Sequence, residues 1–425
     1  MTLYDYYCKA YKVSTDSRNI EPGAVFFALK GERFDGNDFA MEVAEKGVAS
    51  LVVADRKSLP DHPRLLKVDD SLKALQDLAR QHRQELKDLT VIGITGTNGK
   101  TTTKELVSTV LSRKYRVTFT QGNFNNHIGV PLTLLSITPD TEIAVVEMGA
   151  NHPGEIKTLV NIACPDYGII TNIGKAHLEG FGSFEGVINT KKELYDYLRE
   201  HHKTAFVNSD NELLLSLIGD LQFYSYGSGI EAACNVKLKA SDPYLAVTAE
   251  RLGDIQTKLV GAYNLENVSA AIAVGNFFSV DGEDIRQALE QYQPTNSRSQ
   301  VIEGKNHIIM DAYNANPTSM AASVNNFKNI CGDNALLILG DMRELGDTSE
   351  KEHKAILNLL ASSGFHKAFL VGDCFSQYND NPEYHCFAKV EDLIAFLEKQ
   401  PVEHHTILVK GSHGIHLEKV LPLIQ

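Results

Sequence analysis

The fold is decided by one stretch of sequence, Val91-Ile-Gly-Ile-Thr-Gly-Thr-Asn-Gly-Lys-Thr-Thr102, in which an apolar run leads directly into a glycine-rich loop. Glycines let a backbone curl so that its N–H groups point inward, and the N-terminus of a following helix adds positive potential. Lys100 can reach the β- and γ-phosphates of a nucleotide, and the Thr101 hydroxyl can bind Mg²⁺. The predicted ATP-binding residues are Gly96, Thr97, Asn98, Gly99, Lys100, Thr101 and Thr102.

The spacing of the glycines departs from that of the common phosphate-binding loop. Only Thr97 and Asn98 separate Gly96 from Gly99, whereas the common loop has a longer insert. The stretch is therefore a variant, and a glycine-rich turn that binds no ligand is the alternative interpretation. Because a strand, Gly-Lys-Thr and a helix follow one another in register, the sequence favours nucleotide binding.

Strand and helix patterns alternate after residue 89 and predict a parallel sheet covered by helices on both faces. A β-rich stretch at 235–259 and a helix at 264–278 follow, and a second alternating region begins near Pro294. The candidate strands are 89–94, 142–146, 167–171 and 204–207 in the first region and 307–310, 335–339, 367–371 and 406–409 in the second.

The length of 425 residues suggests two to three domains at about 150 residues each. Short strands at 25–29 and 49–54 and helices at 39–46 and 72–86 set the first part of the chain apart from the rest. We predict an α/β protein of three domains, namely a small N-terminal α/β domain (1–87), a central P-loop-type ATPase domain with a parallel sheet (88–293) and a C-terminal Rossmann-like α/β domain (294–425).

Composition narrows the class of protein. Lys and Arg number 41 and Asp and Glu 54, so the net charge of −13, without a basic cluster, argues against nucleic-acid binding. No apolar run is long enough for a membrane helix, and the first residues lack the apolar core of a secretion signal. The six cysteines include no C-x-x-C pair, which is typical of a reducing compartment. We expect a soluble cytoplasmic protein.

Two side chains follow predicted strands at the edge where open α/β sheets bind ligands. Glu147 ends the run Ile143-Ala-Val-Val146, and a carboxylate there is a hard oxygen ligand for a metal. His177 follows Thr171-Asn-Ile-Gly174 and is a second candidate ligand. A solvated or helix-capping carboxylate and a plain hydrogen-bonding histidine are the alternatives.

Lys191 is predicted to lie on the buried face of a helix. Ser183 is a good N-cap, and the helix is expected to run to about Leu198. Lys191 lies at the centre of an apolar stripe, whereas Lys192 is displaced from it by about 100°. A buried ammonium is costly unless it is paired or neutralised, although a snorkelling side chain would avoid that cost. The stripe comprises Phe184, Val187, Ile188, Leu194, Tyr195 and Leu198.

These motifs resemble the Mur ligases, ATP-dependent enzymes that form amide bonds in peptidoglycan synthesis. Residues 95–102 resemble the ATP loop of that family, and Asp16-Ser-Arg18 resembles its UDP-sugar-binding domain. Further similar motifs are Asn123-Phe-Asn-Asn-His-Ile-Gly-Val-Pro131, Glu147-Met-Gly-Ala-Asn-His-Pro-Gly-Glu155, His177-Leu-Glu-Gly-Phe-Gly-Ser-Phe184, Asp311-Ala-Tyr-Asn-Ala-Asn-Pro317 and Gly340-Asp-Met-Arg-Glu-Leu-Gly346.

The resemblance implies roles for individual residues. It implies that Lys100 acts on the phosphates and that Lys191 is carbamoylated and binds Mg²⁺. The Mg²⁺ ligands would be Thr101, Glu147, His177 and carbamoylated Lys191. Asn267 would contact adenine, and Arg298 and Asp311 would meet the nucleotide; a helix-capping asparagine is the alternative interpretation, which better suits Asn264. Substrate contacts would come from Ser17, Arg18, Asn126 and Asn314, although the asparagines of the 123–131 motif have a turn-stabilising role as the alternative.

The resemblance also implies a reaction. A substrate carboxylate attacks the γ-phosphate of ATP, and an amine then displaces phosphate from the acyl phosphate. The motifs are most similar to those of the Mur ligases that join D-Ala-D-Ala to UDP-MurNAc-tripeptide, with the N-terminal domain holding the UDP-sugar and the C-terminal domain closing on ATP and binding the dipeptide. We expect a monomer that needs ATP and Mg²⁺.

Local departures leave alternatives open. The family often has His at the positions of Asn37 and Tyr263, and Arg at that of His413. A sibling that adds a diamino acid is the first alternative, but Glu383 stands where its Asp-Asn-Pro-Arg motif requires Arg. A folylpolyglutamate-synthase-like ligase would lack the motifs at 147–155 and 311–317. A non-catalytic nucleotide-binding scaffold would leave Glu147, His177 and Lys191 without a joint purpose.

Overall fold

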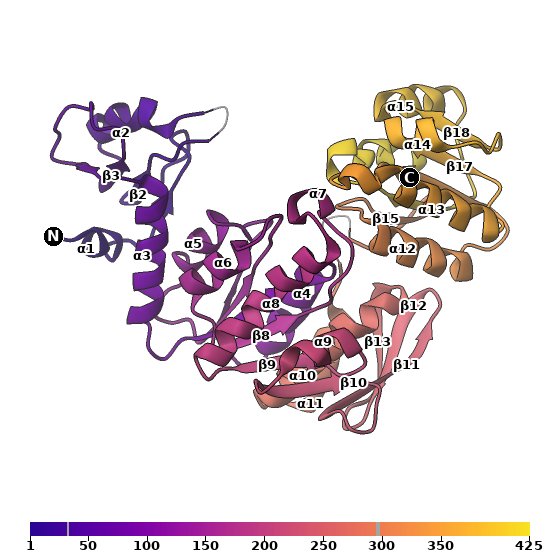
Figure 1. Ribbon diagram of the computed structural model, residues 1–425, viewed down its shortest axis with the longest axis horizontal. Coiled ribbons are helices and arrows are strands. Elements are labelled where there is room, and N and C mark those ends of the chain that lie inside the picture. Colours follow the sequence, from indigo (N-terminus) through magenta and orange to yellow (C-terminus); the bar gives the residue numbers. More distant parts are fainter. Residues whose placement is uncertain (32–33, 295–297) are drawn as a thin grey trace.

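The computed structural model describes residues 1–31, 34–294 and 298–425, which form three sheets with their covering helices (Figure 1). The N-terminal sheet has four parallel strands in the order β1-β2-β3-β4. Alternate residues of β2 face opposite ways, so that Phe26 packs toward α2 while Val25 and Phe27 pack toward α3. Its elements are α1 (Leu3–Tyr7), β1 (Val13–Ser14), β2 (Val25–Phe27), η1 (Gly36–Phe39), α2 (Ala40–Lys46), β3 (Leu51–Ala54), β4 (Leu65–Lys67) and α3 (Ser71–Glu85).

The central sheet has nine strands in the order β13-β12-β11-β10-β9-β8-β5-β7-β6. Its first elements are β5 (Thr90–Thr95), α4 (Lys100–Leu111), β6 (Val117–Phe119), α5 (Gly129–Leu134), β7 (Ile143–Glu147), α6 (Glu155–Ala163), β8 (Tyr167–Ile170) and α7 (Leu178–Phe181). They are followed by α8 (Phe184–Glu200), β9 (Thr204–Asn208), α9 (Glu212–Ile218), β10 (Gln222–Gly227), β11 (Cys234–Ser241), β12 (Tyr244–Ala249), β13 (Gly253–Val260), η2 (Ala262–Asn264), α10 (Leu265–Phe277) and α11 (Gly282–Gln291).

The predicted three-domain α/β class is confirmed, with one correction to the central sheet. The seven strands β5 to β11 all pair parallel, but β12 pairs antiparallel with both β11 and β13. The β-rich stretch at 235–259 therefore extends the same sheet through short hairpins, which can only join antiparallel strands. Strand β10, which the sequence analysis missed, contains the polar residues Gln222 and Ser225 and so lacks a continuous apolar run.

The C-terminal sheet has six strands in the order β14-β15-β19-β16-β17-β18, and only β14 is antiparallel to its neighbour. Its first elements are β14 (Gln300–Glu303), β15 (His307–Asp311), α12 (Pro317–Ile330), β16 (Ala335–Gly340), η3 (Gly346–Thr348) and α13 (Ser349–Ser362). The rest are β17 (Ala368–Val371), α14 (Asp373–Tyr378), β18 (Tyr384–Phe387), α15 (Val390–Lys399), β19 (Thr406–Lys410), η4 (His413–Ile415), η5 (Leu417–Val420) and α16 (Leu421–Ile424).

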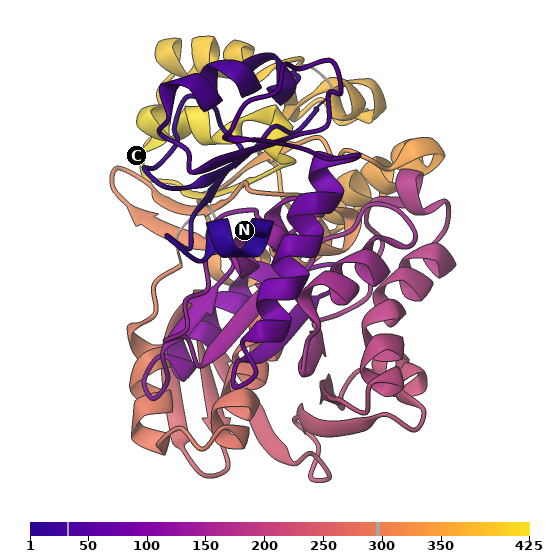
Figure 2. The same ribbon diagram turned by 90° about the vertical axis from the view of Figure 1, so that its left-hand side faces the viewer.

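Helix α3 connects the N-terminal sheet to the central one, where it packs against α5 and α6 (Figures 1 and 2). The Asp166 carboxylate accepts hydrogen bonds from Arg83 of α3 (2.6 Å) and from Lys203 (2.7 Å). The hydroxyl of the buried Tyr7 donates to the carbonyl of Leu135 at 3.0 Å. The bonds of Arg83 and Tyr7 attach the first domain to the central one, and Lys203 of the central domain shares the Asp166 carboxylate. None of the helices within the described ranges is long and apolar enough to cross a membrane.

Candidate active site

The glycine-rich loop joins β5 to α4 and folds Lys100 back over its own backbone. Gly96 and Gly99 have φ angles of 145° and 77°, which glycine adopts without a steric penalty. The Lys100 ammonium donates hydrogen bonds to the carbonyl oxygens of Gly96 (2.9 Å) and Thr97 (3.0 Å). Burial lowers the pKa of Lys100, although the nearby Glu147 carboxylate opposes that shift. A curled backbone, a cation and a helix N-terminus thus meet, as an anion-binding loop requires.

Gly99→Ala is expected to weaken nucleotide binding by about tenfold or more, or by about 1.4 kcal/mol. A methyl group at Gly99 would lie 2.5 Å from the side-chain oxygen of Asn267 and would displace the loop. Gly364→Ala is the matched control, because Gly364 has a φ of 79° but no atom within 4 Å of the added methyl. Titration calorimetry with ADP measures both variants. An unchanged ADP affinity in Gly99→Ala would contradict the prediction.

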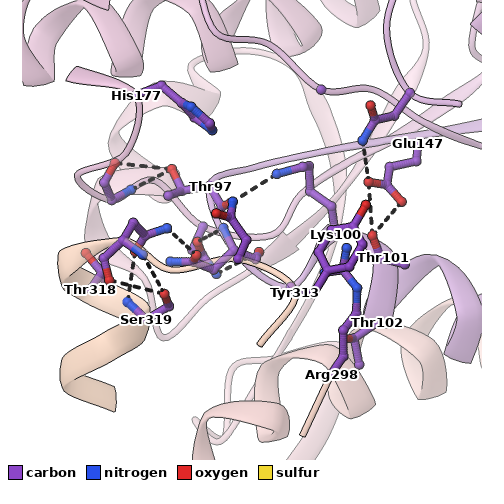
Figure 3. A pocket seen from close by; sticks show the side chains of 18 of the residues that line it. Thr97, Lys100, Thr101, Thr102, Glu147, His177, Arg298, Tyr313, Thr318 and Ser319 are labelled. Carbon is purple, nitrogen blue, oxygen red and sulfur yellow. Dashed lines mark hydrogen bonds between the residues drawn. The ribbon is translucent and has the colours of Figure 1, made fainter. Parts of the chain in front are cut away.

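Thr101 and Glu147 form an oxygen-rich cluster at the carboxyl end of the central strands (Figure 3). The Thr101 hydroxyl lies 2.9 and 3.1 Å from the two carboxylate oxygens of Glu147, whose side chain is 1% exposed. The backbone N–H of Glu147 donates to the hydroxyl of Thr120 at 2.9 Å. Carboxylate and hydroxyl oxygens are the hard ligands that Mg²⁺ prefers, so this donor set fits that ion.

Asn125 is a site residue that the sequence analysis missed. Its Nδ2 donates to Glu147 Oε1 at 2.8 Å. Asn126, which was expected to face substrate, accepts hydrogen bonds from the N–H groups of Ile128 (3.1 Å) and Gly129 (2.9 Å) through Oδ1. These bonds stabilise the turn, and the residue also lines the cavity described below, so its contact with substrate stays a prediction. The asparagine-rich motif was the only signal for Asn125, and it does not say which amide turns inward.

Helix α8 buries Lys191, as predicted. Ser183 caps the helix by accepting a hydrogen bond from the N–H of Gly186, and the Lys191 side chain is 2% exposed. Its ammonium lies 5.7 Å from the centre of the Phe181 ring. Burial, and secondarily the Lys100 ammonium, lower the pKa of Lys191 to about 7. The predicted stripe is wrong at its first member, because Phe184 is 39% exposed at the start of the helix.

A cavity of about 790 Å³ lies between the central and C-terminal domains. Residues of the phosphate loop, Glu147, His177 and the start of α10 line it on one side, and residues between Arg298 and Ser323 line it on the other. Lys191 is not among the cavity-lining residues of the described chain. The imidazole of His177 points from the loop before α7 into this region (Figure 3) and contacts Glu344 of the C-terminal domain through Nδ1.

Asn267 lies under the phosphate loop, with both ends of its amide engaged. Its Oδ1 accepts a hydrogen bond from the Thr103 hydroxyl (3.0 Å), and its Nδ2 donates to Asn264 Oδ1 (2.8 Å). Asn264 precedes α10 but does not cap it through its side chain, which donates to the carbonyl of Val260 (2.9 Å). Asn264 therefore occupies the expected N-cap position without a side-chain capping bond. The three-residue turn η2 already leads the backbone into the helix there.

Arg298 and Asp311 lie on the C-terminal side of the cavity. The Arg298 guanidinium stacks 3.7 Å from the centre of the Tyr313 ring, a cation–π contact. Asp311 accepts hydrogen bonds from Lys410 (2.6 Å) and from the Ser323 hydroxyl (2.9 Å). Tyr313 and Lys410 were not predicted as site residues. Asn314 lines the cavity too, and its Oδ1 accepts a hydrogen bond from the N–H of Ala315 (2.9 Å).

One amide joins the C-terminal domain to the phosphate loop. Asn316 caps α12 by accepting a hydrogen bond from the N–H of Ser319 at 2.9 Å. Its Nδ2 donates to Asn98 Oδ1 at 2.7 Å. A second contact across the same interface is the ion pair of Lys175 with Glu352 at 3.1 Å.

Ser17 and Arg18 lie in the N-terminal domain and do not line the cavity. Arg18 is exposed and forms an ion pair with Asp16 at 2.8 Å, while Ser17 is half-buried. The predicted UDP-sugar contacts are therefore separate from the phosphate loop, and a substrate that reached both would have to span two domains (Figure 1).

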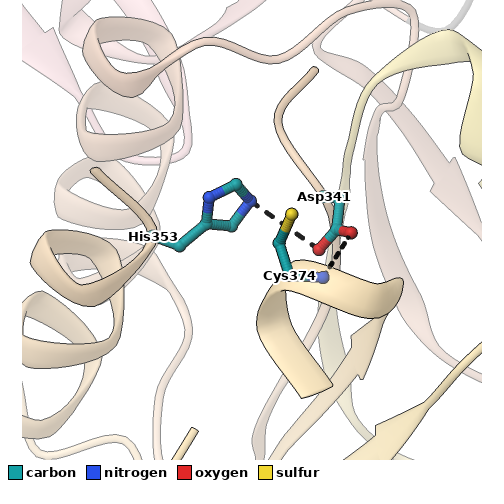
Figure 4. A group of neighbouring side chains, drawn as sticks. All are labelled: Asp341, His353 and Cys374. Carbon is teal, nitrogen blue, oxygen red and sulfur yellow. Dashed lines mark hydrogen bonds and ion pairs between the residues drawn. The ribbon is translucent and has the colours of Figure 1, made fainter. Parts of the chain in front are cut away.

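Asp341, His353 and Cys374 gather beside the C-terminal sheet, where their ligand atoms lie within 4.8 Å of one another (Figure 4). The Asp341 carboxylate accepts hydrogen bonds from the N–H groups of Cys374 and Phe375, both at 2.9 Å. His353 Nε2 accepts from the N–H of Met342 at 3.1 Å, and its Nδ1 lies 2.8 Å from the carbonyl oxygen of Ser349. These bonds occupy both nitrogens of the His353 imidazole. The cluster therefore forms a joint, that is, a fixed connection, between α13, α14 and the loop after β16.

Comparison with known proteins identifies the class. Three family models match the chain. The model of the "Mur ligase middle domain" matches residues 94–275, that of the "Mur ligase, glutamate ligase domain" matches residues 297–413, and that of the "Mur ligase family, catalytic domain" matches residues 9–83. The chain is 37% identical to the UDP-N-acetylmuramoyl-tripeptide–D-alanyl-D-alanine ligase of Bacillus subtilis, covering 96% of this chain and 92% of that protein. The chain therefore belongs to the Mur ligase family.

Solved structures point to one branch of the family. A crystal structure of MurF from Acinetobacter baumannii matches with a TM-score of 0.87 and 31% identity, covering 97% of this chain and 92% of the other. MurF ligase from Thermotoga maritima in complex with ADP matches with a TM-score of 0.86 and 27% identity, covering 100% of this chain and 98% of the other. MurF is thus the family member to which these comparisons liken the chain.

Proposed function

We propose that the protein joins D-Ala-D-Ala to UDP-MurNAc-tripeptide at the expense of ATP, through an acyl phosphate, in the synthesis of peptidoglycan precursors. Near-full-length similarity to ligases of this specificity supports the proposal. The observation that carries it is the cavity in which the phosphate loop, Glu147 and the C-terminal domain meet. ATP and Mg²⁺ are the proposed cofactors.

The first step brings two anions together, since a carboxylate must attack a phosphate. Lys100 would neutralise phosphate oxygens beside the inward-pointing N–H groups of the loop. Thr101 and Glu147 would hold Mg²⁺, which when bound supplies Lewis-acid stabilisation of phosphoryl charge. Arg298 and Asp311 would hold the nucleotide from the C-terminal side, so that docking of that domain excludes water from the site.

Lys191 and His177 would complete the metal site. The Lys191 side chain is almost fully buried, and its ammonium lies over the Phe181 ring, while burial and the Lys100 ammonium lower its pKa toward the neutral amine. A neutral amine is the form that reacts with CO₂, and the resulting carbamate would turn a costly buried cation into a carboxylate-like ligand. His177, which faces the cavity, would supply an imidazole nitrogen.

We further propose that residues 1–87 bind the UDP-sugar through Ser17 and Arg18, that residues 88–293 bind ATP and that residues 294–425 bind the incoming dipeptide. Asn314, at the cavity wall, would contact substrate, and Asn267 would support the adenine end of the nucleotide pocket. The protein would act as a monomer in the cytoplasm.

The acceptor amine discriminates among the possible ligases. Purified enzyme with ATP, Mg²⁺ and UDP-MurNAc-tripeptide is expected to release phosphate with D-Ala-D-Ala and only at background level with glutamate. Parallel reactions with UDP-MurNAc-dipeptide and lysine or diaminopimelate test the sibling reaction, which the missing Arg at Glu383 disfavours. Mass spectrometry of the UDP-pentapeptide identifies the product. Phosphate release that occurs with a diamino acid but not with D-Ala-D-Ala would refute the proposed specificity. An absence of phosphate release with every acceptor would refute it too.

A further inference from the structure

We infer that Glu344 is a positioning residue that accepts a hydrogen bond from Nδ1–H of His177 and directs the Nε2 lone pair of that imidazole toward the nucleotide cavity. The inference rests on the proposed function, because it assigns an orienting partner to a proposed metal ligand. Glu344 follows β16 in the C-terminal domain, whereas His177 precedes α7 in the central domain, so the pair crosses the domain interface.

The chemistry of the two groups fixes the tautomer. A carboxylate only accepts hydrogen bonds, so the Nδ1 that contacts Glu344 must carry a proton. In the neutral imidazole the lone pair is then on Nε2, which is free to bind a cation on the cavity side. Histidines that bind metals commonly donate their other ring N–H to a carboxylate, which fixes the ring and raises its basicity.

The backbones of both partners support a functional contact. His177 has a φ of 51° and Glu344 a φ of 63°, and neither residue is glycine. A left-handed conformation is sterically unfavourable for an L-residue. Such residues persist where the surrounding structure holds them, and they cluster at functional sites. Two of them in contact across a domain boundary indicate that both loops are built to present these side chains.

The loop that carries Glu344 is anchored on both sides of that residue. The N–H of Met342 donates to His353 Nε2 at 3.1 Å, and the N–H of Arg343 donates to the Ser412 hydroxyl at 3.0 Å. On the other side, Leu345 is 3% exposed. The Asp341–His353 joint of Figure 4 therefore serves the active site indirectly, because it holds the loop whose next residues reach His177.

The orientation of His177 would depend on the docking of the C-terminal domain. Because the carboxylate belongs to the C-terminal domain, His177 is held in its metal-binding orientation only while that domain is docked. The undocked enzyme would keep the Thr101–Glu147 cluster but would lack an oriented imidazole. Hydrolysis of ATP before the third domain has docked would thereby be restrained.

The test uses the full-length enzyme with ¹⁵N-labelled histidine, in which the His177 signals are assigned by their absence from His177→Gln. Glu344→Ala is expected to shift His177 from the Nδ1–H tautomer toward a mixture with Nε2–H. It should also raise the Mg²⁺ concentration for half-maximal activity by about 10–100-fold, the usual effect of losing such a partner. Glu344→Asp keeps an acceptor and should recover part of both effects.

Glu350→Gln is the matched control, since Glu350 is an exposed carboxylate of the same domain that pairs with Lys354 at 2.6 Å. It should change neither measurement by more than about twofold. An unchanged His177 tautomer in Glu344→Ala, with or without a loss of activity, would overturn the inference, and so would an unchanged Mg²⁺ dependence. Thermal unfolding verifies that each variant is folded. If no acceptor supports ligation, the proposed function fails, yet the NMR measurement still decides whether Glu344 orients His177.

Discussion

Lys191→Ala is expected to lower kcat by two to three orders of magnitude, or by about 3–4 kcal/mol in activation free energy. The reason is that a carbamate on Lys191 would be a ligand of the proposed metal site, and metal stabilisation of phosphoryl charge contributes several kcal/mol. Excess bicarbonate should not restore activity, because alanine has no amine to modify. Turnover is measured as phosphate release with D-Ala-D-Ala as acceptor.

Lys192→Ala is the matched control for this substitution. Lys192 is the next residue on α8, but it is half-buried and pairs with Asp196 at the helix surface. Wild-type enzyme and Lys192→Ala, equilibrated with ¹³C-bicarbonate, should each show a carbamate carbon signal that is absent from Lys191→Ala. Near-normal turnover in Lys191→Ala, or a carbamate signal that survives that substitution, would contradict the assignment.

Lys100→Ala is expected to reduce kcat by about 10²–10³-fold while leaving the fold intact, an effect similar to removing one preorganised electrostatic contact in other enzymes. Within the described residues, its ammonium donates only to carbonyl oxygens of its own loop, so truncation should lower the unfolding temperature little. Lys100→Arg should not rescue the reaction, because a planar guanidinium cannot replace a compact ammonium inside a curled loop.

Lys114→Ala is the control for the Lys100 substitution. Lys114 follows the same helix, is exposed and donates to the carbonyl of Ser279 at 2.8 Å. Its loss should leave phosphate release within about twofold of wild type, as is usual for surface changes. Equal activity losses in the two variants, or normal turnover in Lys100→Ala, would show that the Lys100 charge does not act on the phosphates.

Sequence reasoning predicted the parts of the site that depend on local patterns. The apolar run before Gly96 specified β5, and the helical period placed Lys191 on a buried face, because each signal is contained in a short segment. The side chain of Glu147 was placed at a strand end for the same reason. Periodicity could not predict the antiparallel edge of the central sheet, because it marks a strand without showing which strand is its partner or in which direction the two pair.

Contacts between distant segments could not be predicted in the same way. Nothing local distinguishes Asn125, which reaches Glu147, from Asn126, which closes its own turn. The contact between His177 and Glu344 joins residues of two domains and depends on how those domains dock. Resemblance to a family suggested that His177 binds metal, but only the three-dimensional arrangement revealed its carboxylate partner.

The amide of Asn316 connects the third domain to the phosphate loop. Its oxygen caps the start of α12, and this bond fixes the rotation of the amide group before its nitrogen reaches Asn98. A donor that is already oriented loses little side-chain entropy when the surfaces meet. Thermodynamic reciprocity then requires that, if ATP stabilises the arrangement of Asn98 that Asn316 recognises, docking strengthens ATP binding by the same factor.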